Sequence, residues 1–217
     1  MAFGYPISLD VTDKVAVVIG TDAVALGKVD ALLAAGAQVR VVATRPGPVL
    51  DRLESTANVA VARRAYRSED VDGAFLVVAS SDDPDLRSRI YRDARRVGAL
   101  VNVMDDVAHC DFAAPAVVRR GDLTIAISTG GGSPALARRL REQLESQFGP
   151  EWGEVLELLA SGRSETLADR PDVAEGSRRW AGALDTEGLT RLVRAGRSEE
   201  AHRLLRDRLL RSHEGAA

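Results

Sequence analysis

The sequence lacks the features that define several protein classes. Cys110 is the single cysteine among 217 residues, which excludes an internal disulfide and fits a reducing cytosol. No apolar run approaches the roughly 20 residues that cross a bilayer, and the first residues lack the basic start and apolar core of a signal peptide. The net charge of −3 shows no basic excess of the kind that nucleic-acid binders carry. We therefore expect a cytoplasmic protein that binds neither membranes nor nucleic acid.

The hydrophobic content is 45%, although aromatic residues make up only 4%, so the chain can bury a sizeable core in one large or two modest domains. In the first half, apolar runs alternate with amphipathic segments, as in a parallel α/β sheet. Strands are expected at 14–20, 38–43, 59–66, 74–79 and 100–104, and helices at 23–35 and from about 81 or 82 to 97. Ligands of open α/β sheets bind beyond the carboxyl ends of the strands. The loops at Gly20, Thr44, Ser80 and Asp105 should therefore line one crevice.

The pattern changes after about residue 113. Residues 116–120 and 123–128, separated by Gly121 and Asp122, predict a hairpin, and helical patterns follow at 152–161, around 178–184, at 186–194 and at 198–212. The stretch 162–175 is rich in Ser, Asp and Pro and is interpreted as a flexible connector. The expected domains are a dinucleotide-binding domain at 1–112, a dimerisation and ligand segment at 113–149, and a helical domain at 150–217.

A strongly signalled helix start follows three consecutive glycines. Ser133 is a good N-cap, because its hydroxyl accepts from a free backbone N–H, and Pro134 suits the first helical position. Gly130, Gly131 and Gly132 precede them. A helix start of this kind offers N–H donors and the positive end of a dipole, so the predicted ligand is an anion.

Four stretches carry a resemblance to a known family: VVIGTDAVALGK, SSDDPD, NVMDDVAHCDF and PAVVRRGDLTIAISTGGGSPALARRLREQLE. The chain resembles the precorrin-2 dehydrogenase and sirohydrochlorin ferrochelatase family, the N-terminal module of siroheme synthase. The resemblance covers essentially the whole chain and is strongest from Asn102 to Glu145. It implies a Rossmann-like parallel sheet, a small dimerisation segment and a C-terminal helical domain. It further implies a homodimer that oxidises precorrin-2 to sirohydrochlorin with NAD, and in many members inserts ferrous iron. No methyltransferase module follows in this sequence, so we expect the fused bifunctional arrangement to be absent.

The glycine loop departs from this family. A dinucleotide fingerprint needs a glycine for the tight turn, a second where the backbone approaches the diphosphate, and a small third residue. Gly20 and Ala25 fit the first and third places, but Asp22 occupies the second, and Thr21 replaces a glycine usual in the family. Asp22 adds bulk and negative charge, and it can cap the helix itself. The alternative is therefore a loop that no longer holds NAD well.

The second strand ends without the carboxylate that bonds the ribose hydroxyls, because Thr44 and Arg45 follow Ala43. By resemblance, the cofactor is contacted at positions matching Ala23, Val24, Thr44 and Arg45. An arginine there could instead bind a 2′-phosphate, so both NAD and NADP are possible cofactors. A surface arginine at a loop start is otherwise common.

Asp105 is the candidate catalytic residue. It ends a predicted core strand, and by resemblance it matches the aspartate that family members use in dehydrogenation and in chelation. A carboxylate can accept the protons released in either reaction. The structural alternative is that Asp105 and Asp106 form a turn or a cap, and we assign that role to Asp106.

His109, Cys110 and Asp111 resemble a metal site on paper. Three consecutive side chains cannot all face one ion without unusual backbone geometry, and closed zinc sites need four well-spaced ligands. We interpret all three as structural and expect no resident metal site.

The family's tetrapyrrole substrate carries many carboxylates, which arginine binds bidentately. Singly, each arginine in the region is more often a solvated charge, but their clustering beside the glycine-rich helix start favours a ligand role for the group. The candidate substrate contacts are Thr129, Gly130, Gly131, Ser133, Arg119, Arg120 and Arg138, with Arg139 and Arg141 nearby.

The sequence thus favours an NAD-dependent dehydrogenase of siroheme or cobalamin-branch synthesis, with insertion of iron or cobalt left open. One alternative is a chelatase or tetrapyrrole-binding protein whose nucleotide site has degenerated at Thr21 and Asp22. A second is a noncatalytic Rossmann-like sensor or carrier.

Overall fold

The computed structural model describes residues 3–20, 22–45, 47–167, 180 and 184–211. It divides into two compact units. The first contains the chain up to Ala114 together with residues 130–132, and the second contains Pro115–Thr129 and the chain from Ser133 onward. None of the helices in the described ranges is long and apolar enough to span a membrane.

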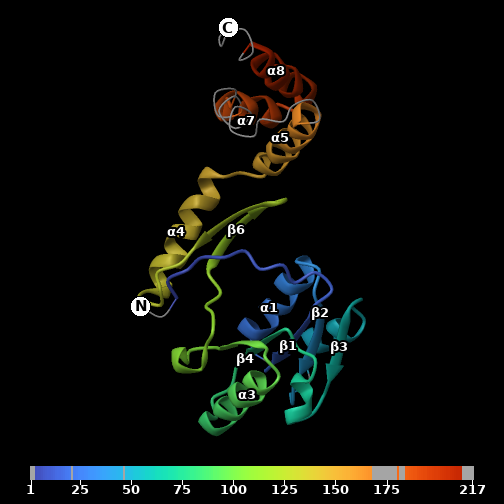
Figure 1. Cartoon of the computed structure of the whole chain (residues 1–217), viewed down its shortest axis with the longest axis vertical. Helices are drawn as coiled ribbons and strands as arrows, with labels where there is room; N and C mark the ends of the chain where they lie inside the picture. The colour runs from blue at the N-terminus through green and yellow to red at the C-terminus, as the bar shows by residue number, and fades with distance from the viewer. Residues whose placement is uncertain (1–2, 21, 46, 168–179, 181–183, 212–217) are drawn as a thin grey trace. The chain divides into compact units, whose positions relative to one another are not determined.

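The first unit is built on a five-stranded parallel sheet in the order β3-β2-β1-β4-β5. Figure 1 shows its strands side by side in the lower part of the picture. The strands are β1 (Val15–Ile19), β2 (Gln38–Val42), β3 (Val59–Ala62), β4 (Leu76–Ala79) and β5 (Leu100–Val103). This arrangement confirms the predicted Rossmann-like sheet.

Helices cover both faces of this sheet, which explains its nearly continuous apolar strands. The helices are α1 (Ala23–Ala34), α2 (Pro48–Glu54) and α3 (Pro84–Arg96), with short 3-10 turns at Ser68–Val71 and Val107–His109. Val18 packs in one core cluster with Val29 of α1, whereas Val17 packs in the other with Ile90 of α3. Each such buried side chain stabilises the fold by roughly 1.5–3 kcal/mol.

Two features of the first unit differ from the sequence prediction. Helix α2 was not predicted, because its seven residues are too few to show a helical period, yet Leu50 and Leu53 are buried. Strand β3 is shorter than expected. Tyr66, which was assigned to that strand, lies beyond it and donates its hydroxyl hydrogen to Asp93 at 2.9 Å.

The second unit begins with the predicted hairpin, whose strands are β6 (Ala116–Arg120) and β7 (Leu123–Ile127). Val118 lies opposite Ile125, and Gly121 in the turn has a left-handed φ of 54°. Helix α4 (Pro134–Gln147) begins as predicted, because the Ser133 hydroxyl accepts from the backbone N–H of Leu136 at 3.2 Å.

Three further helices share a second core: α5 (Glu151–Leu167), α7 (Thr186–Arg194) and α8 (Ser198–Arg211). The prediction of a connector at 162–175 was wrong for its first six residues, which continue α5. Gly162 lies within this helix and lets Leu205 and Trp180 pack closely against it, because a Cβ there would lie 3.3 Å from atoms of both. Residues 168–175, and most of the helix expected around 178–184, lie outside the described residues.

Candidate functional site

The carboxyl ends of four strands meet at one edge of the first unit. The backbone N–H of Gly20, after β1, donates to Val42 of β2 at 3.0 Å, and that of Met104, after β5, donates to Ala79 of β4 at 2.8 Å. The loops that carry Asp22, Thr44, Ser80 and Asp105 therefore start from the same edge. Strands β1 and β4 are the neighbours at which the strand order reverses, which is where open α/β sheets bind ligands.

Gly20 is required by the backbone geometry at the start of this edge. Its φ is +130°, and a Cβ added to it would lie 2.8 Å from the carbonyl oxygen of Ser80. Ala25, at the third fingerprint position, is fully buried in α1. Both residues thus have the geometry of a dinucleotide-binding turn.

Asp22 caps α1, as the sequence indicated it could. Its Oδ1 accepts from the backbone N–H groups of Val24 at 2.9 Å and Ala25 at 2.8 Å. Partial burial on its own raises the pKa of Asp22. Hydrogen bonds from Ser80, Ala25 and Val24 outweigh it, so the pKa lies below its ordinary value. The sequence did not indicate the contact with Ser80, because Ser80 lies 58 residues after Asp22 in the chain. Thr21 lies outside the described residues.

Thr44 and Arg45 are both exposed directly after β2. No acidic residue occurs between Ala43 and Gly47 in the sequence, so the end of this strand carries a hydroxyl and a positive charge but no carboxylate. A carboxylate at this position would have favoured an unphosphorylated ribose.

Asp105 follows β5 in a left-handed conformation, with a φ of 59°, and its side chain is exposed. Aspartate is one of the few residues other than glycine that adopt this conformation without large strain. Such backbone positions occur at functional sites as well as in turns. Of the two neighbouring carboxylates, Asp105 is the one that a ligand could reach, because the side chain of Asp106 is only 18% exposed.

Asp106, His109, Cys110 and Asp111 have partners within the fold. Asp106 lies 2.9 Å from Nδ1 of His109, and the Cys110 thiol donates to the Val103 carbonyl at 3.0 Å. Burial raises the pKa of the Cys110 thiol, so it favours the neutral form.

Asp111 accepts from the backbone N–H of Val101 at 3.1 Å and from Arg95 at 2.9 Å. These contacts agree with the structural role that we predicted for His109, Cys110 and Asp111. Across the described part of the chain, no cluster of three or more His, Cys, Asp or Glu side chains is arranged to hold a metal ion.

The glycine-rich loop before α4 is closed by a side chain. The Thr129 hydroxyl accepts from the backbone N–H of Ser133 and donates to its carbonyl oxygen, both at 3.1 Å. Gly130 and Gly131 have left-handed φ values of 60° and 86°. The loop therefore depends on its glycines, and the Thr129 hydroxyl stabilises it.

The arginines of the second unit differ from one another. Arg120 donates to the carbonyl oxygens of Phe148 at 2.7 Å and Glu145 at 3.2 Å, so it caps the C-terminal end of α4. This differs from the predicted substrate contact, because the guanidinium is occupied by the protein. Arg119 is exposed, and the side chain of Arg138 is 79% exposed and 3.6 Å from Glu142.

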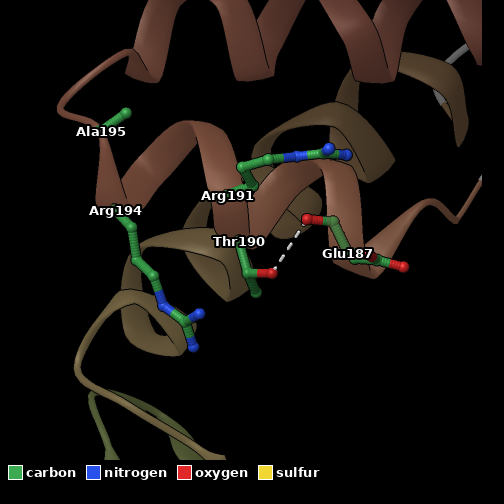
Figure 2. Close-up of a pocket in the computed structure, with 5 residues that line it drawn as sticks. All are labelled: Glu187, Thr190, Arg191, Arg194 and Ala195. Atoms are coloured by element: carbon green, nitrogen blue, oxygen red, sulfur yellow. Dashed lines mark hydrogen bonds between the residues drawn. The ribbon is translucent and has the colours of Figure 1, made fainter.

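A shallow hollow on α7 was not indicated by any sequence motif. It is lined by Glu187, Thr190, Arg191, Arg194 and Ala195. Figure 2 shows the two arginine side chains extending in different directions, and Arg194 is paired with Glu151 at 2.6 Å. Polar groups do not converge there, so we favour the sheet edge as the functional site.

Comparison with known proteins identifies two family matches and a shared fold. Residues 7–116 match a family described as putative NAD(P)-binding, and residues 120–147 match a family described as sirohaem biosynthesis protein central. The solved structure of SirC, precorrin-2 dehydrogenase, superposes with a TM-score of 0.72 at 22% identity, covering 94% of this chain and all of that one.

Curated relatives extend the match. The chain is 33% identical over 211 residues to siroheme synthase 1 of Serratia proteamaculans, which covers 97% of this chain and 44% of the relative. It is 35% identical over 176 residues to siroheme synthase of Neisseria meningitidis, which covers 81% of this chain and 36% of the relative. The chain thus spans less than half the length of these relatives. The match over residues 7–116 spans half of the chain, so the chain belongs to the family described as putative NAD(P)-binding, and it is similar to the siroheme synthases.

Proposed function

We propose that this chain catalyses the NAD-dependent oxidation of precorrin-2 to sirohydrochlorin, as a cytoplasmic homodimer. The observation that carries the proposal is the exposed carboxylate of Asp105, which follows β5 at the same sheet edge as the Gly20 turn. Similarity to the siroheme synthases and the fold shared with SirC, precorrin-2 dehydrogenase, support the choice of substrate.

The residues at the β1–α1 turn fit a dinucleotide, with one departure. Gly20 forms a turn in which a Cβ would collide with Ser80, so its backbone is open to close approach. Gly20, Asp22, Ala23 and Val24 would lie along the diphosphate, where Asp22 competes for the N–H donors of α1. Thr44 and Arg45 would contact the ribose, which leaves NADP as a second possible cofactor. When bound, the nicotinamide ring supplies the hydride acceptor.

In the proposed reaction, Asp105 acts as the general base. Oxidation of precorrin-2 removes a hydride, which reduces NAD⁺, and a proton, which passes to the Asp105 carboxylate. The electron pair of the broken bond to that proton forms the new double bond of the macrocycle. A positioned base of this kind contributes about 10²- to 10⁴-fold to a rate.

The same carboxylate could serve metal insertion, which removes two pyrrole protons as a divalent ion enters the macrocycle. One observation favours a chelatase with a weakened nucleotide site as the second candidate function. Asp22 already satisfies the N–H groups of Val24 and Ala25 that a diphosphate would use.

The substrate carboxylates need cationic and N–H donors, and we propose those of the α4 start and its surroundings. Arginine suits this role because its guanidinium binds a carboxylate through two parallel hydrogen bonds. The proposed contacts are Thr129, Gly130, Gly131, Ser133, Arg119 and Arg138, without Arg120, whose donors are occupied.

Poor burial of the hairpin and α4 supports the homodimer. From Pro115 to Gln147, the buried hydrophobic side chains are those of Val118 and Ala137, whereas Leu136 is 50% exposed. A second copy of the chain on this surface would remove apolar area from water.

The decisive experiment incubates the purified chain with precorrin-2 and NAD⁺, and separately with sirohydrochlorin and Fe²⁺ or Co²⁺. The proposal requires sirohydrochlorin and NADH to form in equal amounts. Metal insertion without NAD-dependent oxidation would favour the chelatase, and tetrapyrrole binding without either reaction would favour a carrier.

A further inference from the structure

The left-handed turn at Asp105 is held by contacts of the next residue. Aspartate adopts this conformation at a smaller cost than most residues with a side chain, and contacts around it can hold it there. Among the described residues, the Asp105 carboxylate itself takes part in none of the hydrogen bonds or ion pairs found. The restraint therefore comes from the flanking chain.

The Asp106 carboxylate bridges two elements. Its Oδ2 lies 2.9 Å from Nδ1 of His109, in the 3-10 turn that follows, and 3.5 Å from Nε of Arg87 on α3. Because an ionised carboxylate only accepts, Nδ1 of His109 carries the hydrogen of this bond. The Arg87 Nε is buried and has no hydrogen-bond partner in the described structure. Its positive charge is instead balanced by the ion pair with the Asp106 carboxylate.

Backbone groups of Asp106 add further restraints. Its N–H donates to Val103 at 3.2 Å, and its carbonyl accepts from the His109 N–H at 3.0 Å and the Cys110 thiol at 3.2 Å. The His109 ring is in turn fixed by an edge contact with Tyr91 of α3, at 5.1 Å between ring centroids. Hydrogen bonds within the segment from Val103 to Cys110, and contacts with α3, therefore restrain its conformation.

We propose that Asp106, held by His109 and Arg87, is a positioning residue that presets the Asp105 carboxylate for proton transfer. This role rests on the proposed function, in which Asp105 is the base. Positioning matters because a displacement of about 1 Å can lower a rate by about 10²-fold. Asp106 reaches no substrate itself and acts through the turn.

The test compares Asp106→Ala and Asp106→Asn with a matched control, Asp72→Ala. Asp72 also pairs with an arginine of α3, at 3.1 Å, but with Arg96 at the opposite end of the helix. Hydride transfer from precorrin-2 to NAD⁺ is measured as kcat and as KM for each substrate, and thermal unfolding confirms that the variants fold.

We expect Asp106→Ala to lower kcat about 10- to 100-fold with KM for NAD⁺ nearly unchanged. Asp106→Asn should recover part of this loss, because its amide oxygen still accepts from His109. The control should match the wild type. Asp106→Ala with a kcat within about twofold of the wild type would overturn the assignment.

Hydrogen exchange distinguishes failure of this inference from failure of the proposed function, because it needs no turnover. In Asp106→Ala, exchange at the amides of residues 105–109 should accelerate about tenfold or more, with α1 unchanged. If the wild type does not oxidise precorrin-2, the proposed function fails, and faster exchange would still establish that Asp106 holds the turn. Unchanged exchange in both Asp106 variants would overturn the inference whatever the activity.

Discussion

Replacing Asp22 with asparagine should tighten the binding of NAD⁺, because it removes a negative charge from the start of α1 and keeps the cap. The Asp22 carboxylate accepts from Val24 and Ala25, and asparagine caps a helix about as well as aspartate. The lowered pKa of Asp22 means that the carboxylate is charged at neutral pH, so it opposes a diphosphate there.

The size of the effect follows from the exposure of Asp22. Two like charges about 4 Å apart repel by about 1 kcal/mol in water and by about 4 kcal/mol at an effective dielectric constant near 20. Asp22 is exposed, so the value lies toward the lower limit, at about 1–2 kcal/mol. This corresponds to roughly a 5- to 30-fold lower Kd.

Isothermal titration of NAD⁺ into the wild type, Asp22→Asn and Asp22→Gly measures this directly. Asp22→Gly should bind at least as tightly as Asp22→Asn, because it also frees the two N–H donors and costs only a few tenths of a kcal/mol in helix capping. The gain should shrink at about 1 M salt, where charges are screened over about 3 Å. An Asp22→Asn variant that binds NAD⁺ no more tightly than the wild type would refute this account of the loop.

Three further predictions concern the fold. Gly20→Ala should destabilise the protein by about 2 kcal/mol or more in urea unfolding, since it combines a φ of +130° with a contact 2.8 Å from Ser80; an unchanged midpoint would contradict this. The Asp70 carboxylate accepts hydrogen bonds from Arg64 at 2.6 and 2.8 Å. These bonds, together with one from the backbone N–H of Arg67, lower the pKa of Asp70 by more than its burial raises it. Its stabilising effect is therefore present above the ordinary aspartate pKa and is lost as the pH falls through the lowered value, so the wild type and Asp70→Asn should converge in unfolding free energy in acid. Ser133→Ala should cost about 1 kcal/mol and Ser133→Asn much less, and thermal unfolding showing equal losses would argue against the cap.

The sequence predicts the elements that have strong local signals. Strands β1 and β4 are apolar because most of their residues are buried, and shorter apolar runs mark β2, β3 and β5, so the sequence placed all five strands. The α4 start was predicted for a similar reason, since Ser133 and Pro134 have well-defined positional preferences. Self-capping by Asp22 was also foreseeable, because the cap contacts lie within three residues of it.

Contacts between distant residues could not be predicted in this way. Arg120 looked like a ligand contact, but its guanidinium is bound by Phe148, 28 residues away. Gly162 looked like part of a connector, but it is packed against Leu205 and lies within α5. In both cases tertiary packing decides the role, and a single sequence does not display it. The same applies to Asp106, whose ion pair with Arg87 depends on how α3 lies against β5.

The most direct test of the central claim, that Asp105 takes the proton during oxidation, is the single-turnover rate of precorrin-2 oxidation by Asp105→Asn. Asparagine tolerates the left-handed φ of 59°, so the turn should persist, and equilibrium binding of NAD⁺ and the tetrapyrrole should stay close to that of the wild type. We predict a rate lower by about 10²- to 10⁴-fold, because the amide cannot accept the proton. Turnover near the wild-type rate, with both ligands bound, would contradict the claim.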